Sequence, residues 1–271
     1  MVTIDNLTVS YRQHPALHHI SGQFATGSLT AVIGPNGSGK STLLKSIMGL
    51  LRPEGGQITL NTPRSSVAYL AQLTEIDRSF PMSVRDCVML GCWSAVGPWG
   101  RVPPALLQRV DNAITRVGLT GFEQRTVGSL SSGQLQRVLF ARLMVQQADL
   151  ILLDEPFNAM DSRTIAALLT LVHQWHTEGR TVIAVLHDDE QVRQHFPQTV
   201  MLARELVAWG DTAKVLTPAH LQCARLLAEA WDDNADICHT DEAMQPLPAK
   251  PAVAAIAQAK DTAAAQLVSP Q

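Results

Sequence analysis

The stretch that decides the fold of this 271-residue chain is Leu29-Thr30-Ala31-Val32-Ile33-Gly34-Pro35-Asn36-Gly37-Ser38-Gly39-Lys40-Ser41. A compact apolar run ends at a glycine, and a glycine-rich turn that closes on a lysine and a serine follows it. Apolar residues then recur at helical spacing until the breaker at 52–56. The order of strand, glycine-rich loop and helix is the context in which a Gly-x-x-x-x-Gly-Lys-Ser loop binds phosphate.

The residue types of this loop explain why it suits an anion. Glycines let backbone N–H groups turn toward phosphate oxygens, and the N-terminus of the following helix adds partial positive charge. Lys40 contributes a full charge, and we expect the Ser41 hydroxyl to ligate Mg²⁺. The expected nucleotide-binding positions are Gly34, Pro35, Asn36, Gly37, Ser38, Gly39, Lys40, Ser41 and Thr42. The alternative to a phosphate-binding loop is a glycine-rich turn without a ligand, beside a surface lysine.

Acidic and basic groups follow two further apolar runs. Asp154 and Glu155 come directly after Leu150-Ile151-Leu152-Leu153, and His187 comes directly after the run at 181–186. The carboxyl ends of parallel strands meet at one edge of a sheet, where ligands of such sheets bind. We expect Asp154 to hold Mg²⁺ through its water shell, Glu155 to polarise an attacking water, and His187 to sense charge near a γ-phosphate. Helix capping by the acidic pair and a purely structural histidine are the alternatives.

The rest of the chain predicts an α/β organisation. The pattern of residues 2–33 is typical of short strands. The pattern from about 74 to 145 predicts a helical insertion, with apolar residues on one face of its helices. A helix between the runs at 150–153 and 181–186, capped by Asp161 or Ser162, implies a right-handed parallel crossover. From about Asp232 the composition turns acidic and then rich in Ala and Pro, so we expect residues 232–271 to be disordered or weakly helical.

Composition excludes several classes of protein. The formal charge is -3, from 24 acidic and 21 basic side chains, and the absence of a basic run argues against nucleic acid as a partner. No apolar stretch approaches the ~18 residues needed to cross a bilayer, and the N-terminus lacks the pattern of a secretory signal. The four cysteines show no CxxC spacing, so we expect reduced thiols in a cytosolic protein.

These motifs together resemble the ATP-binding subunits of ABC transporters over residues 1 to about 218. The resemblance rests on the loop at 34–41, Leu130-Ser131-Ser132-Gly133-Gln134, the run at 150–156 and His187. It implies an ABC ATPase fold of the P-loop NTPase class: a mixed-sheet, RecA-like core with an N-terminal antiparallel β region and an inserted helical subdomain. The implied ATPase domain is 1–231, with its helical subdomain at about 74–145.

The resemblance also assigns roles to positions that spacing alone does not explain. Ser131, Gly133 and Gln134 would meet the γ-phosphate of an ATP held by a second copy, although an ordinary cap on a helix is the alternative. The usual glycine at position 132 is Ser132 here. Tyr11, which we expect to end the second strand, would stack on adenine, or be an ordinary edge tyrosine. Gln72 would touch Mg²⁺, so the implied Mg²⁺ ligands are Ser41, Gln72 and Asp154.

The segment that follows Glu155 departs from the family pattern. Asn158-Ala159-Met160-Asp161 occupies the position of the D-loop, where serine is common at the first residue. Asn158 can still form hydrogen bonds, and Asp161 has a second explanation as a helix cap.

The implied partners are a second copy in head-to-tail arrangement and integral membrane permease subunits that dock near residues 72–91. A periplasmic or surface metal-binding protein would deliver cargo, and the subunit would lie peripherally on the cytoplasmic side of the inner membrane. The run at 80–91 and Asp154-Glu155-Pro156-Phe157 resemble the branch that imports zinc and manganese, with zinc the favoured cargo. Importers of ferric siderophores or cobalamin, soluble ABC-type ATPases that act on nucleic acid or ribosomes, and an ATP-binding module without turnover are the alternatives.

Metal binding by the chain itself has weak support in the sequence. Cys238 and His239 lie among acidic residues, and His14, His18 and His19 form a loose group, but neither set has a recognised ligand spacing. Cys87 and Cys92 are expected to be buried as small hydrophobic residues.

Overall fold

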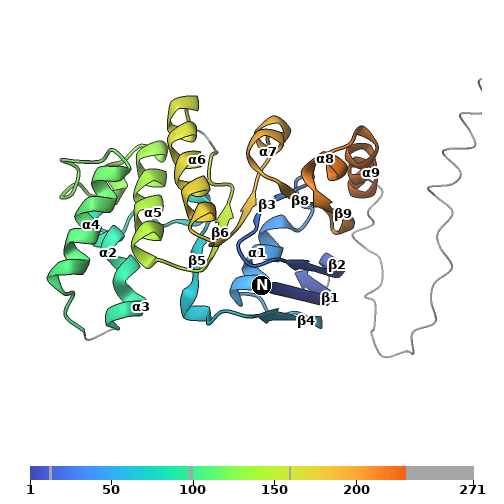
Figure 1. The fold of residues 1–271 in the computed structure, drawn as a ribbon, viewed down its shortest axis with the longest axis horizontal. Helices are drawn as coiled ribbons and strands as arrows, with labels where there is room; N and C mark the ends of the chain where they lie inside the picture. Colours follow the sequence, from blue (N-terminus) through green and yellow to red (C-terminus); the bar gives the residue numbers. More distant parts are fainter. Residues whose placement is uncertain (12–13, 98–99, 159, 230–271) are drawn as a thin grey trace, which may run out of the picture. The chain divides into compact units, whose positions relative to one another are not determined.

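The computed structural model describes residues 1–229 except 12–13, 98–99 and 159. In this part of the chain a six-stranded sheet is the centre of the fold (Figure 1). In spatial order its strands are β5 (Val67–Leu70), β6 (Leu150–Asp154), β7 (Thr181–Val185), β3 (Leu29–Ile33), β8 (Gln198–Ala203) and β9 (Glu205–Asp211). The first five strands are parallel and β9 is antiparallel to β8, so the mixed sheet expected from the sequence is confirmed.

A second, antiparallel sheet contains the first strand of the chain. It has the order β2 (His14–Phe24), β1 (Val2–Tyr11) and β4 (Gly55–Leu60). The register of β1 shifts after residues 4 and 5, next to Asn6 with a φ of 49°. The chain stays in one strand through this irregularity. Tyr11 therefore ends the first strand, and our expectation that it ends the second is wrong.

The strands of the large sheet are buried on both faces, as continuous apolar runs predict. Alternate residues of one strand enter different cores: Ile151 and Leu153 of β6 lie in one, and Leu150 and Leu152 lie in the other. The first core also holds buried side chains of the helices at 132–146 and 162–177, and the second those of the helix at 40–48 and of β1 and β2. The large sheet is thus the middle layer of three, and its carboxyl edge is left free for a site.

The described residues form nine α-helices. They are α1 (Lys40–Met48), α2 (Val84–Met89), α3 (Trp93–Val96), α4 (Pro104–Arg116), α5 (Ser132–Gln146), α6 (Ser162–Thr177), α7 (Asp189–His195), α8 (Thr212–Val215) and α9 (Pro218–Glu229). Short 3₁₀ turns occur at η1 (Arg64–Ser66), η2 (Leu73–Glu75), η3 (Leu90–Cys92) and η4 (Val127–Ser129). Figure 1 shows α2, α3 and α4 gathered at one end, beside α5.

Helices α2 to α5 all lie between β5 and β6 in the chain, inside the stretch expected to be a helical insertion apart from the last residue of α5. The division into an ATPase domain at 1–231 with a helical subdomain at 74–145 stays a prediction. The expected disorder at 232–271 lies outside the described residues, as do Cys238 and His239. None of the helices in the described part of the chain has the length and apolarity that a bilayer crossing requires.

Candidate active site

The glycine-rich loop connects β3 to α1 at the carboxyl edge of the large sheet. Two of its glycines are required by close backbone contacts and positive φ. A Cβ on Gly34, whose φ is 146°, would lie 2.0 Å from the carbonyl oxygen of Leu202. A Cβ on Gly39, whose φ is 90°, would lie 2.3 Å from that of Ala16. Gly39 also forms the N-cap of α1, so the first N–H groups of this helix face the loop.

The amine of Lys40 lies inside this loop. Its Nζ donates to the carbonyl oxygens of Gly34 and Pro35 at 2.9 and 2.8 Å, and the side chain is buried. Burial lowers the pKa of Lys40, while the Glu155 and Asp154 carboxylates act in the opposite direction. Ser38 Oγ is also buried, and it has no hydrogen-bond partner among the described residues. An unsatisfied hydroxyl beside a buried cation fits a loop that closes on an anion.

Ser41, Asp154 and Gln72 come together from three segments. Ser41 Oγ donates to Asp154 Oδ1 at 2.9 Å, and Gln72 Nε2 donates to Ser41 Oγ at 3.3 Å. Asp154 is fully buried, and this burial raises its pKa, although its hydrogen bonds from Ser41 and Tyr69 act in the other direction. A hydroxyl, a carboxylate and an amide supply the oxygen ligands that Mg²⁺ prefers, and a cation would offset the buried charge of Asp154. The three residues therefore fit the Mg²⁺ site expected from the sequence.

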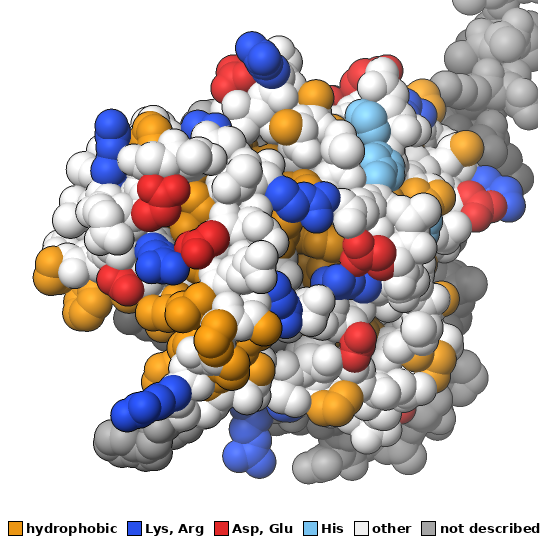
Figure 2. All heavy atoms as spheres, turned by 60° about the vertical axis from the view of Figure 1, so that its left-hand side comes forward, with side chains coloured by type: hydrophobic (Ala, Val, Ile, Leu, Met, Phe, Trp, Pro, Cys, Tyr) orange, Lys and Arg blue, Asp and Glu red, His pale blue; other side chains and the backbone are white. Residues whose placement is uncertain are grey.

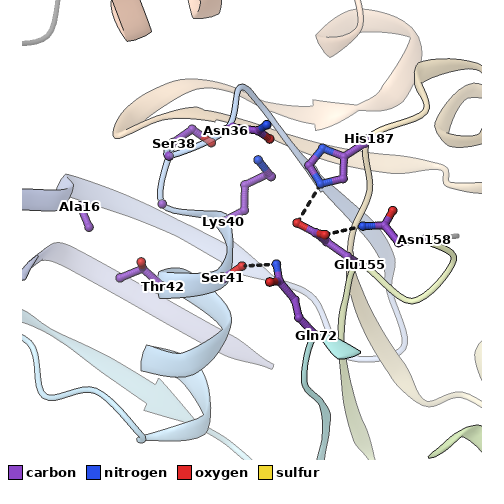
Figure 3. A pocket seen from close by; sticks show the side chains of 12 residues that line it. Ala16, Asn36, Ser38, Lys40, Ser41, Thr42, Gln72, Glu155, Asn158 and His187 are labelled. Carbon is purple, nitrogen blue, oxygen red and sulfur yellow. Dashed lines mark hydrogen bonds and ion pairs between the residues drawn. The ribbon is translucent and has the colours of Figure 1, made fainter. Parts of the chain in front are cut away.

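Glu155 and His187 meet at the ends of β6 and β7. His187 Nε2 lies 2.9 Å from Glu155 Oε1, and the other carboxylate oxygen, Oε2, accepts a hydrogen bond from Asn158 Nδ2. Glu155 has a φ of 50°, which is uncommon for a residue other than glycine. The Glu155 side chain points into the cleft (Figure 3), whereas the preceding residue, Asp154, is fully buried.

One cleft of about 660 Å³ joins these groups. Figure 3 shows the side chains of Lys40, Ser41, Glu155 and His187 converging on it. Its lining residues are Ala16, Asn36, Gly37, Ser38, Gly39, Lys40, Ser41, Thr42, Gln72, Glu155, Asn158 and His187. The structure thus unites the loop, the acidic strand end and the histidine, which lie far apart in the sequence.

The Leu130–Gln134 element begins α5 and does not line this cleft. Ser131 is the N-cap, and a capping box links it to Gln134: Ser131 Oγ accepts from the Gln134 backbone N–H at 3.2 Å, and Gln134 Oε1 accepts from the Ser131 N–H at 3.0 Å. Ser132 occupies the first turn, and its Oγ accepts from Arg78 Nη2 at 3.3 Å. The helix-cap interpretation of Ser131 is therefore confirmed as geometry, while the role toward a second copy stays a prediction.

Other predicted residues have different positions. Asp161 is the N-cap of α6, with its Oδ1 accepting from the Thr164 N–H at 2.9 Å, so the capping explanation is confirmed. The side chains of Tyr11 and His14 are outside the described part of the structure, and adenine stacking by Tyr11 stays a prediction.

His18 and His19 join no cluster of three or more potential metal ligands among the described residues. Cys87 and Cys92 are buried, as expected, and burial raises the pKa of both thiols.

Sequence reasoning missed three contributors to the site. Ala16 of β2 lines the cleft, but no motif marks it. Tyr69, on the strand beside β6, donates its hydroxyl to Asp154 Oδ2 at 3.2 Å. Gln136 is buried, and its Nε2 donates at 2.8 Å to the carbonyl oxygen of Pro156, which ties α5 to the turn after Glu155. Of these three residues, only Gln136 could have been found from the sequence. It is a glutamine on the apolar face of a predicted helix, and a buried amide needs a hydrogen-bond partner.

Fold and cleft together define a P-loop nucleotide-binding protein, with a phosphate-binding loop and an acidic strand end at the carboxyl edge of a largely parallel sheet. Comparison with known proteins narrows this class. The profile of the ABC transporter family matches residues 17–158. The chain belongs to the ABC transporter ATPase family, whose members are ATP-binding, ATP-hydrolysing subunits of transporters.

Three curated relatives illustrate the match. The manganese transport system ATP-binding protein MntB of Listeria innocua is 40% identical over 228 residues, which cover 82% of this chain and 95% of that protein. MntB of Bacillus subtilis is 37% identical, with coverage of 82% and 90%. The zinc transport system ATP-binding protein TroB of Treponema pallidum is 38% identical, with coverage of 82% and 86%.

Solved structures agree on the fold. A chain of a transporter described as of the metal-chelate type, in an inward-facing conformation, matches with a TM-score of 0.74 and 28% identity, over 83% of this chain and 88% of that chain. The dimeric structure of a bacterial ABC transporter cassette matches with a TM-score of 0.70 over 78% and 99% of the two chains. At 23% identity, this second likeness shows the fold alone.

Proposed function

We propose that this chain powers the import of a divalent metal ion, manganese or zinc, by hydrolysing ATP on the cytoplasmic side of the membrane. The observation that carries the ATPase half of the proposal is the convergence of Lys40, Glu155 and His187 on one cleft. The transport half rests on relatives at 37% to 40% identity that are named for manganese or zinc transport.

The residues of the cleft divide the work of hydrolysis. The Lys40 amine and the N–H groups at the start of α1 bind the phosphates. When ATP binds, the Lys40 amine exchanges its hydrogen bonds to the Gly34 and Pro35 carbonyl oxygens for hydrogen bonds to phosphate oxygens. Ser41, Asp154 and Gln72 would hold Mg²⁺, which supplies positive charge against the phosphate oxygens. Glu155 orients and polarises the attacking water, and His187 donates toward the charge that develops on the transferred group.

A second copy would complete the cleft in head-to-tail arrangement. At the start of α5, Ser131 is exposed and the next three residues are half-buried, and none of these residues lines the cleft of its own chain. A Cβ on Gly133 would meet no described atom within 4 Å, and its φ lies outside the left-handed region, so this chain's own packing gives no reason for a glycine there. A group from outside that approaches the backbone closely does give one. ATP held at Lys40 of one copy and at Gly133 of the other would join the two.

The permease docks, in this proposal, on an apolar surface of the helical insertion itself. Phe80, Leu90 and Trp93 are large hydrophobic residues that are 61%, 40% and 57% exposed. Figure 2, which brings the end of the molecule with α2 to α4 forward, shows hydrophobic side chains gathered over its lower part. Exposed apolar surface of this kind suits a partner surface that removes it from water. Gln72, a few residues upstream of Phe80, would connect this surface to the nucleotide site.

The cleft of this chain binds ATP in this proposal, so the transported ion is selected by other subunits of the transport system. The names of the relatives support manganese more often than zinc, so zinc, the cargo favoured by the sequence analysis, stays a prediction. The test is growth and cellular metal content of a strain that lacks this chain, starved of zinc or of manganese. We expect growth to fail under starvation for one ion and to return when that ion is added or when the intact chain is expressed.

The K40A chain is the matched control, since it has the same partner surfaces and lacks the phosphate-binding amine. Complementation by K40A would contradict a role for ATP hydrolysis. Rescue by ferric siderophore or cobalamin, with no effect of either metal ion, would place the chain in one of the other importer classes. Association with ribosomes or nucleic acid in place of a membrane protein would overturn the transport proposal.

A further inference from the structure

Both oxygens of the Glu155 carboxylate have a partner in the cleft. Oε1 lies 2.9 Å from His187 Nε2, and Oε2 accepts the hydrogen bond from Asn158 Nδ2 (Figure 3). His187 comes from a different segment of the chain, whereas Asn158 lies three residues after Glu155 in the same turn. The two donors therefore approach the carboxylate from independent parts of the fold.

The backbone of this turn does not need the Asn158 side chain. Asn158 is exposed, and its backbone N–H donates to the Glu155 carbonyl oxygen at 3.4 Å, which any residue at this position could do. Among the described residues, the Asn158 side chain has one hydrogen-bond partner, Glu155 Oε2, which accepts from Asn158 Nδ2. The side chain thus contributes to the cleft and not to packing.

We propose that Asn158 is a positioning residue that fixes the direction of the Glu155 carboxylate for attack on ATP. This inference rests on the proposed role of Glu155 as the group that polarises water. A carboxylate has about four lone-pair directions, so one hydrogen bond on each oxygen fixes its plane and leaves acceptor capacity for water. A neutral amide orients the carboxylate without adding a full positive charge beside it.

Asn158→Asp tests this with a side chain of nearly the same size that cannot donate and that repels Glu155 when ionised. We expect kcat to fall by at least about tenfold, because a misdirected base loses much of its effect. ATP affinity should change by less than about twofold, because the phosphate contacts come from the loop and α1. Asn112→Asp on the exposed surface of α4 makes the same chemical change away from the cleft and should leave kcat unchanged.

A double-mutant cycle separates positioning from a general effect on the turn. In the E155Q background, single-turnover hydrolysis by the E155Q/N158D protein should equal that of E155Q alone, because the carboxylate that Asn158 directs is gone. N158A removes the donor without adding charge and should lower kcat in the same direction, so the test survives if N158D folds poorly in thermal unfolding.

Three results would overturn the proposal: full kcat in N158D and N158A, an equal loss from N158D in both backgrounds, or a loss of ATP affinity that accounts for the whole effect. Undiminished turnover in E155Q is a different result. It would remove Glu155 from its proposed role and with it the reason for positioning.

Discussion

Ser41 Oγ donates a 2.9 Å hydrogen bond to Asp154 Oδ1, although the two residues are 113 positions apart in the chain. The contact joins the first turn of α1 to the end of β6, and it brings together a hydroxyl and a carboxylate, two of the oxygen ligands of the proposed Mg²⁺ site. Asp154 is fully buried, and burial raises its pKa. Burial therefore makes a negative charge on Asp154 unfavourable unless a cation is bound.

The first prediction concerns this buried charge. A carboxyl group whose pKa is raised on folding stabilises the protein below its unfolded pKa, and this stabilisation is lost as the pH rises through the folded pKa. At pH 7, D154N should therefore unfold at a higher temperature than the wild type without nucleotide, by about 2–4 °C per kcal/mol gained. Thermal unfolding followed by circular dichroism measures the difference.

Mg²⁺ and ATP should make the wild type more stable than D154N. Mg²⁺ with ATP should raise the unfolding temperature of the wild type, because a ligand at about 100 times its Kd stabilises by about 2.7 kcal/mol. D154N should gain less and should hydrolyse ATP slowly. A wild-type protein that is the more stable one without ligand would contradict our account of Asp154.

The second prediction concerns Glu155. E155Q keeps the shape of the side chain and its place beside His187 but removes the proton acceptor, so turnover should fall by at least about 10²-fold. ATP binding should persist, because Lys40 and the loop are intact. Steady-state phosphate release and titration with a fluorescent ATP analogue give the two quantities. Similar turnover in the two proteins would remove Glu155 from the reaction.

Lys40 is the subject of the third prediction. Its buried amine is the cation nearest the expected phosphates, and a hydrogen bond from a charged donor is worth about 1.5–3 kcal/mol. K40A should therefore bind ATP about 10- to 100-fold more weakly. The same fluorescent titration measures this, with R163K on the exposed surface of α6 as a control. Undiminished affinity in K40A would contradict the phosphate-binding role of the loop.

The fourth prediction follows from a histidine pair outside the cleft. His173 Nε2 of α6 lies 3.2 Å from His195 Nδ1 of α7, and burial, then the neighbouring His195 and His176, lower the pKa of His173. A histidine with a lowered folded pKa takes up a proton first in the unfolded state. Stability is therefore retained above the unfolded pKa of about 6.5 and lost as the pH falls toward the folded value.

H173Q should reduce this loss, because it keeps a polar side chain and removes the titrating group. We expect the unfolding temperatures of wild type and variant to differ in their change between about pH 7.5 and pH 5.5, with the wild type losing more. Equal losses in the two proteins would show that His173 does not carry the effect.

Much of the site could be predicted from sequence because its chemistry lies in continuous motifs. The loop at 34–41 has a fixed spacing, and strands that are apolar throughout place Asp154, Glu155 and His187 at one sheet edge. The hydroxyl of Tyr69 on Asp154 could not be predicted, because it depends on which strand lies beside β6. Tyr11 ends the first strand because β1 passes through an irregularity at Asn6 that periodicity does not reveal.

Gln72 and Asn158 show a second limit of prediction from the sequence. Resemblance to a family places Gln72 at the Mg²⁺ site and Asn158 in the D-loop, whereas neither residue type alone indicates a site. The structure places both in the cleft, and it gives Asn158 a partner, Glu155 Oε2, that resemblance did not suggest. The orientation of a side chain in a turn depends on backbone angles such as the φ of 50° at Glu155, which sequence patterns do not specify.

The central claim is that each working site takes its phosphate-binding loop from one copy and its Ser131 end of α5 from another. The most direct test mixes two inactive proteins, K40A and S131R, and measures ATP hydrolysis in the presence of the permease. If sites are shared and copies pair at random, half of the dimers are mixed and each has one intact site, so turnover should return to about a quarter of the wild-type value. If the loop and the Ser131 element of one chain serve the same ATP, every site in the mixture carries a defect, and turnover that stays at the level of the separate variants would contradict the claim.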